Sequence, residues 1–396
     1  MDDILSNIRV LDLGRFISAP FCGMLLADMG AEVIKIERVD VGEDGRRLGP
    51  YKNGISAYVT AFNRNKLGMT LNFRSAEGKE IFKQLIKKSD VIIENFRPGT
   101  MAAMGFDYDT VKSINPSIIM SSISGFGQKG LQRDRAAFDG IASAMGGLYA
   151  INYTEAGPRA TGLPLADHIT GIYNALAIVL GLYDRKNTGR GQYIDTAMLD
   201  CVFSLFETRL PGYALNGSDI GTLSKFGTGD PLACPSNVYE CKDGFVCLHA
   251  GTDPNYVKFA EVTGVRELMD QKYSKIECRM ANYNYVDGLA AKWFKSKTVE
   301  EADTMLNTAG VPIGIVRNFK QIMDDPNSGE REMVVYTEVP GIGPVPFCGN
   351  PLKLLTRPIA KRDRAPLIGE HTDAILSNLL GMSQENINVL REAGVI

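Results

Sequence analysis

The chain has 396 residues, of which 44% are hydrophobic and 22% are charged, and its 43 Lys and Arg against 46 Asp and Glu leave a formal net charge of −3. This composition is typical of a soluble globular protein, and the length allows two domains. The near balance of charge gives no electrostatic reason to expect nucleic acid or a membrane as a partner.

Apolar strands and helices alternate along the first 125 residues. The predicted strands are 8–13, 31–37, 67–73, 90–96 and 117–123, and the predicted helices are 20–29 and 75–88. This alternation predicts a doubly wound α/β layer with a parallel sheet. Ligands of such sheets lie beyond the carboxyl ends of the strands. One rim should therefore gather residues 15–19, Arg38, residues 95–99 and residues 124–130.

A dinucleotide-binding fingerprint is missing after the first predicted strand. Residues 14–20 read Gly-Arg-Phe-Ile-Ser-Ala-Pro, which does not contain the pattern G-x-G-x-x-G, and the chain has no P-loop. We therefore do not expect a nicotinamide or flavin cofactor bound in the usual way.

The rest of the chain mixes helices with short strands. The predicted elements are helices at 138–147, 167–183 and 199–210, a strand at 192–196, a hairpin at 237–249 with Asp243-Gly244 as its turn, helices within 254–309, strands at 311–316 and 334–339, and a helix at 372–380. A loop at 217–235 rich in Gly, Ser, Thr and Pro interrupts the pattern. We predict a large domain from residues 1–200 and 330–396, a smaller α+β domain at 225–325, and linkers at 201–224 and 326–329.

Asp167 lies where the longest predicted helix begins. Gly162 and Pro164 precede it, and Gly189 follows the basic residues that end the helix. Free backbone N–H groups and the helix dipole favour an anion at such a terminus. The local pattern leaves two interpretations open, a plain N-cap residue or an ionised carboxylate that acts as a nucleophile in a cleft.

Cysteine and histidine give little support for a metal site. Seven cysteines are scattered singly without a CxxC pair, and the three histidines are far apart in sequence. An odd number of unpaired cysteines in a large chain favours reduced thiols in the cytoplasm.

The first residues contain neither a basic nor an apolar segment, so we expect no signal peptide. The longest apolar run, residues 175–182, is too short to span a bilayer.

Several motifs in one order carry a resemblance to a known family. They are Val10-Leu-Asp-Leu-Gly14 with Pro20, Ala31 to Glu37, Asn63-Arg-Asn-Lys66, Asp90 to Gly99, Ser124 to Gln128, Pro164 to Gly171, Thr188 to Gln192, and Pro366 to Asp373. Together they resemble the class III CoA-transferases, which include formyl-CoA and carnitine CoA-transferases. The resemblance implies a Rossmann-like large domain from both chain ends, a smaller α+β domain and an interlocked homodimer.

The resemblance also implies a reaction. The substrates would be an acyl-CoA and a carboxylic acid, with coenzyme A thioester as substrate and no permanently bound cofactor. Asp167 matches the family's nucleophile, which forms a mixed anhydride and then an aspartyl-CoA thioester. The nucleophile must be ionised at neutral pH, which the helix terminus favours.

Other residues match the family's coenzyme-binding positions. Arg38 suits phosphate recognition. The remaining predicted contacts are Ile17, Ser18, Asn63, Lys66, Asn95, Phe96 and Arg97, with Asp139 as an acidic residue near the nucleophile. Ala103 and Ala136 stand where some relatives carry Arg and Lys, which is a departure from the family pattern.

Two further departures bear on the substrate and the reaction. Residues 226–235 lack the run of glycines of formyl-CoA transferases, which argues against formyl-CoA or oxalate, although Gly227 and Gly229 would allow a mobile flap. Phe138 stands where α-methylacyl-CoA racemases carry a catalytic His, and we expect His168 to be a packed or capping residue. A transferase is therefore favoured over a 2-methylacyl-CoA racemase, a CoA-binding protein without turnover or an oxidoreductase.

Overall fold

Two compact units make up the chain in the computed structural model, which describes residues 3–154, 157–216, 229–356 and 363–396. The first unit comprises Met1–Leu148, Ala160–Leu205 and Asn327–Ile396. The second comprises Tyr149–Arg159 and Phe206–Pro326. The residues of the candidate site all belong to the first unit.

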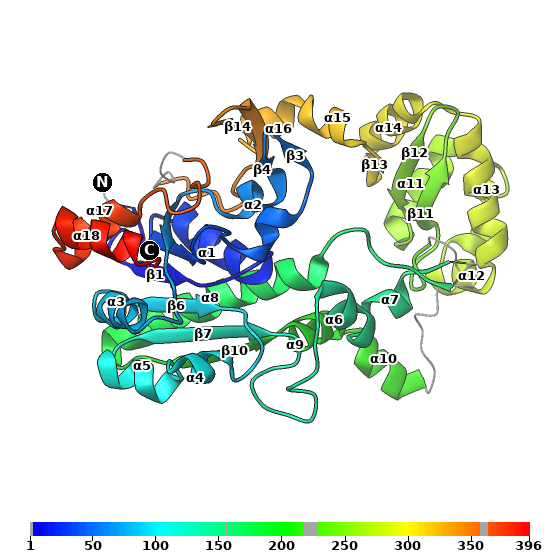
Figure 1. Cartoon of the computed structure of the whole chain (residues 1–396). Coiled ribbons are helices and arrows are strands. Elements are labelled where there is room, and N and C mark those ends of the chain that lie inside the picture. Colours follow the sequence, from blue (N-terminus) through cyan, green and yellow to red (C-terminus); the bar gives the residue numbers. More distant parts are fainter. Residues whose placement is uncertain (1–2, 155–156, 217–228, 357–362) are drawn as a thin grey trace. The chain divides into compact units, whose positions relative to one another are not determined.

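A six-stranded parallel sheet forms the centre of the first unit, in the order β10-β7-β6-β1-β2-β5 (Figure 1). Its strands are β1 Arg9–Asp12, β2 Glu32–Glu37, β5 Lys66–Thr70, β6 Val91–Glu94, β7 Ile119–Ser124 and β10 Tyr193–Ala197. Leu11 pairs with Ile34 on one side and Ile92 on the other. All three are fully buried, as the strands of a sheet covered on both faces should be. The predicted parallel sheet is confirmed.

Alternate residues of the strands pack into two separate cores. Leu11, Ile34 and Ile92 belong to one core, together with Phe82 of helix α3. Val10 and Val33 belong to the other, together with Ile178 of helix α8. The first unit contains helices α1 Ser18–Asp28, α2 Ala57–Phe62, α3 Ala76–Lys87, α4 Thr100–Met104, α5 Tyr108–Ile114, α6 Asp139–Met145, α7 Leu148–Ile151, α8 Leu165–Thr188, α9 Met198–Phe203, α16 Pro326–Glu330, α17 Thr372–Leu380 and α18 Gln384–Glu392, with α7 and α16 at the borders of the second unit.

Short elements complete the first unit. They are the 3₁₀ turns η1 Asp44–Arg47 and η2 Ser204–Phe206, the latter at the border of the second unit, the hairpin of β3 Tyr51–Lys52 and β4 Ile55–Ser56, and the hairpin of β14 Val334–Val339 and β15 Gly343–Cys348.

Helix α8 crosses α1 at a glycine. A Cβ atom at Gly171 would lie 2.9 Å from the backbone oxygen of Ser18 and 2.8 Å from the ring of Phe21. Buried Asn174 fixes the next turn, because its Oδ1 accepts hydrogen bonds from Ser121 at 2.5 Å and from Thr196 at 2.8 Å. The helix is thereby held against α1, β7 and β10.

The outer face of α8 is apolar and exposed. Ile172, Leu176, Leu180 and Tyr183, which follow one another at helical spacing, are 53%, 53%, 58% and 69% exposed. By length and composition alone, α8 could cross a membrane, although core helices pass the same test and 44% of its most apolar 18-residue window is buried. The sequence prediction considered only the uninterrupted apolar run and therefore missed this property.

The second unit has a three-stranded antiparallel sheet in the order β11-β12-β13, with the predicted hairpin between the first two strands. Buried Arg279 donates to the carbonyl oxygens of Cys234, Tyr273 and Gly251. The described elements of the second unit are β8 Tyr153–Thr154, β9 Gly157–Pro158, α10 Arg209–Asn216, β11 Ser236–Glu240, β12 Phe245–His249, α11 Asp253–Thr263, η4 Gln271–Tyr273, α12 Ile276–Ala281, α13 Tyr283–Lys295, α14 Val299–Thr308, β13 Ile313–Ile315 and α15 Phe319–Met323.

Two of the differences between predicted and observed elements are a break in a helix and an earlier end of a strand. The helix expected at 199–210 is divided into α9, η2 and α10, and the Ser204 hydroxyl donates to the Cys201 carbonyl at the break. The strand expected at 67–73 ends at Thr70. Residues 217–228, which include most of the predicted loop at 217–235, lie outside the described residues.

Candidate active site

Asp167 lies in the first turn of α8, next to a second carboxylate. Pro164 is the N-cap residue of the helix, so the interpretation of Asp167 as a plain N-cap is wrong. The backbone N–H of Asp167 donates to Oδ1 of Asp139, the first residue of α6, at 3.2 Å. The side chain and the backbone of Ser18, at the start of α1, both hydrogen-bond the Asp167 carboxylate.

The surroundings of Asp167 weaken its acidity. Burial and, to a smaller extent, the negative charge of Asp139 raise the pKa of Asp167, the hydrogen bonds from Ser18 oppose this shift, and the resulting pKa is about 7. That the helix N-terminus favours the ionised carboxylate at neutral pH stays a prediction. A carboxylate with this pKa is a stronger base and nucleophile than an ordinary one.

Replacing Asp167 with asparagine should change how stability depends on pH. The pKa of Asp167 in the folded chain, about 7, lies above its usual 3.8, so ionisation of the group opposes folding. This cost is absent below about pH 4, grows between pH 4 and 7, and is complete above pH 7. Asp167→Asn should therefore raise Tm at about pH 8 but not at about pH 4, as measured by thermal denaturation.

The exposed Asp324 provides a control for that comparison. Asp324→Asn removes only an exposed ion pair with Lys320 and should shift Tm little at either pH. A Tm for Asp167→Asn that moves equally at both pH values would contradict the assigned shift.

A cavity of about 150 Å³ opens beside Asp167, and we call it the Asp167 cavity. Its walls come from segments that follow β1, β6 and β7 and from the start of α8, as expected for the carboxyl ends of parallel strands. The lining residues are Arg15, Phe16, Ser18, Asn95, Phe96, Arg97, Pro98, Ile123, Ser124, Gly125, Arg133, Arg135, Ala136, Ala137, Phe138, Asp167 and Met198.

Asn95 fastens the loop after β6 to the loop after β1. Its Oδ1 accepts from the backbone N–H of Arg15 at 2.8 Å, and its Nδ2 donates to the Arg15 carbonyl at 2.7 Å and to the Ser18 hydroxyl at 3.2 Å. The guanidinium of Arg15 lies 5.0 Å from the centre of the Phe96 ring. Predicted residues Ser18, Asn95 and Phe96 are thus brought together at one rim.

A larger cavity of about 740 Å³ shares Arg15 and Phe96 with the first, and we call it the Arg38 cavity. Asn72, Phe73 and Arg74 form part of its wall. Arg38 donates to Gly42 O at 3.1 Å and to Asp44 at 2.6 Å, and its side chain is 52% exposed. Exposed guanidinium groups beside aromatic rings suit a ligand with phosphate and base groups, and the volume is that of a small-molecule site.

Four predicted site residues are not among the residues that line either cavity in the described part of the chain, and one of them, Asp139, instead accepts from the backbone N–H of Asp167. Ile17 is buried at the N-cap of α1. Lys66 donates to Asp12, to the Pro20 carbonyl and to Asn63 at 2.7, 2.7 and 2.8 Å, and its side chain has no exposed area. Asn63 is likewise buried. Their role in coenzyme binding stays a prediction, and the structure gives the two polar residues partners inside the protein.

The sequence analysis did not single out Asn72, Phe73 and Arg74 as site residues. Residues that directly follow a parallel strand are expected at the ligand-binding rim, but this strand was predicted to continue to residue 73, whereas β5 ends at Thr70. Arg133 and Arg135 also line the Asp167 cavity, and no signal in the sequence distinguished them from surface arginines. Arg133 and Arg135 add positive charge near Ala136, which lines the same cavity and departs from the family pattern.

Histidine does not enter the Asp167 cavity in the described part of the chain. The ring of His168 packs 4.9 Å from Phe21 and 5.7 Å from Phe62, and its Nδ1 lies 2.7 Å from the Pro164 carbonyl oxygen. His168 is therefore a packed residue, as expected. Phe138 is 67% exposed, and the centre of its ring lies 5.5 Å from the centre of the Phe16 ring. Among described residues, no group of three or more His, Cys, Asp or Glu could hold a metal ion.

Comparisons with known proteins agree with this geometry. The family model of CoA-transferase family III matches residues 5–372. The chain is 32% identical to succinyl-CoA–D-citramalate CoA-transferase of Chloroflexus aurantiacus, covering 99% of this chain and 98% of that protein. It is 35% identical to formyl-CoA:oxalate CoA-transferase of Bradyrhizobium sp. strain ORS 278, covering 100% and 98%. The crystal structure of a CAIB/BAIF family protein from Brucella suis matches with a TM-score of 0.84 and 30% identity, covering 96% of this chain and 100% of that one.

Proposed function

The chain belongs to CoA-transferase family III and is a CoA-transferase, and we propose that it transfers coenzyme A from an acyl-CoA to a carboxylic acid through a covalent intermediate on Asp167. The observation that carries this proposal is the Asp167 carboxylate, which faces a cavity at the sheet rim and is hydrogen-bonded by Ser18. Coenzyme A would be a substrate, with no permanently bound cofactor.

In the first half of the proposed cycle, an oxygen of Asp167 attacks the thioester carbonyl of the donor. The C–S bond breaks, the CoA thiolate leaves, and a mixed anhydride joins Asp167 to the donor's acyl group. The thiolate then attacks the Asp167 carbonyl, which gives an aspartyl-CoA thioester and releases the donor's free acid. Both hydrogen-bond donors of Ser18 are placed to stabilise negative charge on the Asp167 oxygen during this attack.

In the second half, the carboxylate of the acceptor attacks the aspartyl thioester and displaces the thiolate. The thiolate attacks the acceptor's acyl carbon in the new anhydride, so that the new acyl-CoA leaves and the Asp167 carboxylate is restored. Each step forms one bond and breaks one, and no nucleoside triphosphate is needed. Water must be excluded while the anhydride exists.

The two cavities suit the two ends of coenzyme A. We assign the nucleotide to the Arg38 cavity, where Arg38, Arg74 and Phe96 offer guanidinium groups and an aromatic face. The thioester end would reach Asp167 through the Asp167 cavity, past Arg97 and the shared residues Arg15 and Phe96.

The apolar face of α8 supports a homodimer. Ile172, Leu176, Leu180 and Tyr183 form a continuous exposed stripe along this face, and large exposed apolar patches mark interaction sites. We infer that a second copy of the chain covers this stripe in an interlocked dimer, and that the protein acts in the cytoplasm without nucleic acid or membrane as a partner.

The acid that accepts coenzyme A is the finer part of the proposal. One relative is named for succinyl-CoA and D-citramalate, and another for formyl-CoA and oxalate. We propose a small or medium carboxylic acid other than oxalate, because residues 226–235 lack a run of glycines. Residues 226–228 of this segment, including Gly227 of the predicted flap, lie outside the described residues.

The covalent intermediate can be trapped directly. After incubation with an acyl-CoA from a panel of donors, hydroxylamine should convert activated Asp167 into a hydroxamate, and peptide mass spectrometry should locate the change there. A sample without acyl-CoA is the control. Turnover with an unmodified Asp167 peptide would contradict the intermediate, and loss of the α-proton of a 2-methylacyl-CoA in D₂O would favour the racemase instead.

A further inference from the structure

We propose that Glu43 is a positioning residue for the chemistry at Asp167, because its carboxylate holds the backbone of Phe16 in the conformation that presents Ser18 to Asp167. Glu43 touches no reacting atom in this proposal and acts through the loop that joins β1 to α1. The inference rests on the proposed role of Asp167 as nucleophile.

Phe16 has an unfavourable backbone conformation. Its φ of +63° lies in the left-handed region, which bulky residues rarely adopt without support. The backbone N–H of Phe16 donates to Oε2 of Glu43 at 2.8 Å. This contact is the support that the conformation requires, since Arg15 on the preceding side is fixed separately by Asn95.

Glu43 is itself fixed from several directions and is 3% exposed. Its Oε1 lies 3.4 Å from the Lys35 ammonium and accepts from Asn63 Nδ2 at 3.3 Å. Its backbone N–H donates to Glu37 at 2.9 Å. Such a carboxylate has one available position, which is what a positioning residue needs.

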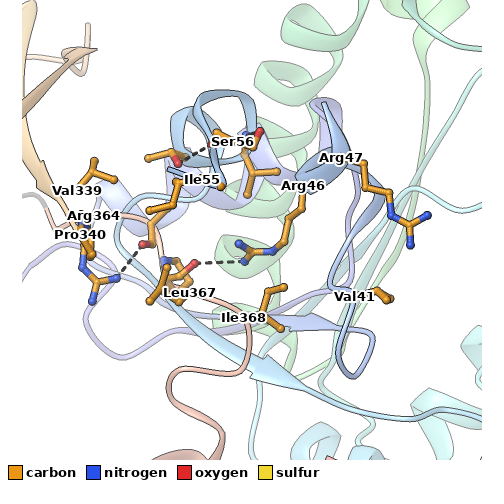
Figure 2. A pocket seen from close by; sticks show the side chains of 15 residues that line it. Val41, Arg46, Arg47, Ile55, Ser56, Val339, Pro340, Arg364, Leu367 and Ile368 are labelled. Carbon is orange, nitrogen blue, oxygen red and sulfur yellow. Dashed lines mark hydrogen bonds between the residues drawn. The ribbon is translucent and has the colours of Figure 1, made fainter. Parts of the chain in front are cut away.

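The partner of Glu43, Glu37, is held in turn by Arg46. The guanidinium of Arg46 makes two hydrogen bonds to Glu37, at 2.7 and 2.6 Å, and a third to the Pro366 carbonyl at 3.2 Å. Figure 2 shows Arg46 turned toward the segment that carries Leu367, in a cavity of about 370 Å³. The network thus connects the β1–α1 loop to the C-terminal part of the first unit.

Phe16 reaches Asp167 along two routes. Along the backbone, Ser18 follows two residues later and hydrogen-bonds the Asp167 carboxylate. Through its ring, Phe16 packs edge-on against Phe138, the residue before Asp139, whose carboxylate accepts from the Asp167 N–H. A displaced Phe16 would therefore disturb both contacts of the nucleophile.

The direction in which the titration midpoint of Asp167 moves separates a positioning role of Glu43 from the simple loss of its negative charge. Burial and the negative charge of Asp139 on α6 raise the pKa of Asp167, and burial together with the charges of Asp167 and Glu43 raises the pKa of Tyr58 on α2. Loss of a negative charge at position 43 would by itself favour the ionised form of Asp167. Loss of the Ser18 hydrogen bonds would disfavour it and would raise the titration midpoint of Asp167.

The test compares Glu43→Ala and Glu43→Gln with the native enzyme. We expect Glu43→Ala to lower kcat about a hundredfold, with KM for acyl-CoA changed less than about threefold, and Glu43→Gln, which keeps an acceptor oxygen, to have a smaller effect. The ¹³C NMR titration of the Asp167 carboxyl, assigned with Asp167→Asn, should show a raised midpoint in Glu43→Ala. If the native enzyme shows no exchange, the proposed function fails, while the NMR titration still tests Glu43.

Phe16→Asn should restore part of the kcat that Glu43→Ala loses, because asparagine adopts the left-handed conformation more readily than phenylalanine. The loss of kcat caused by Glu43→Ala should be several-fold smaller in the Phe16→Asn background. Buried Asp28, which pairs with Arg64 at 2.6 Å at the other end of α1, is the matched control, and Asp28→Asn should not move the Asp167 midpoint.

Three results would overturn the proposal. They are an Asp167 midpoint that is unmoved or lowered in a folded Glu43 variant, a raised KM with unchanged kcat, and an equal loss of kcat in both backgrounds. If Glu43→Ala does not fold, the folded Glu43→Gln variant decides by the same midpoint and kcat measurements.

Discussion

Asp167→Ala is expected to lower the rate of CoA exchange between an acyl-CoA and a free acid by about 10⁴-fold or more. The substitution removes the only group to which the acyl moiety and then coenzyme A are bonded in the proposed cycle, so neither half can proceed. The Arg38 cavity is untouched by this change, and the affinity for CoA should remain within a few-fold of the native value. Exchange is measured by mass spectrometry and affinity by titration calorimetry.

Asp134→Ala is the control for that loss. Asp134 carries the same charge close to the arginines of the Asp167 cavity, but its side chain is 86% exposed. It should retain nearly full exchange, because surface substitutions away from the chemistry have small effects. Exchange that persisted in a purified Asp167→Ala sample would remove Asp167 from the role of nucleophile.

Leu176→Arg combined with Leu180→Arg is expected to convert the protein from a dimer into a monomer and to abolish exchange. Both leucines lie on the exposed face of α8 and are 53% and 58% exposed, so burying the rest of each side chain would stabilise an interface by about 1 kcal/mol. In a two-fold dimer each substitution occurs twice, and an unpaired guanidinium in an apolar contact adds a desolvation cost. Analytical ultracentrifugation of native and variant proteins measures the change.

Leu131→Arg tests whether added charge alone has this effect. Leu131 is also exposed but lies far from α8 in sequence, in the segment between β7 and α6. This variant should keep the mass of a dimer. A double variant that sediments like the native protein would show that the stripe on α8 is not the contact between subunits.

The rim of the sheet was predictable from sequence because its rule is geometric. Parallel strands end at one edge, so Arg15 and Asn95 meet although 80 positions separate them. The same rule failed at Asn72, because Leu71 is 1% exposed and continues the apolar pattern after the strand has ended. An apolar residue can be buried outside a ladder of hydrogen bonds, and the sequence pattern does not distinguish the two cases.

The interior of the site was less accessible to prediction. Lys66 lies in a motif that matches the family, but nothing in the sequence states that its ammonium faces Asp12. Burial opposes ionisation of Asp12, yet Lys35 and Lys66 outweigh it and lower the pKa of that carboxyl. The pKa of Asp167 depends on how deeply its carboxylate is buried and on how close Asp139 lies to it, and the sequence states neither.

Gly171 has a consequence for how this enzyme can vary. No side chain separates α1 from α8 at this position, so the spacing between the Asp167 carboxylate and Ser18 depends on the contact of the two helices. Substrate preference can then drift through the loops that surround the rim while this spacing stays constant. In the proposed mechanism, the helices that hold the nucleophile are thus distinct from the loops that would select the acid.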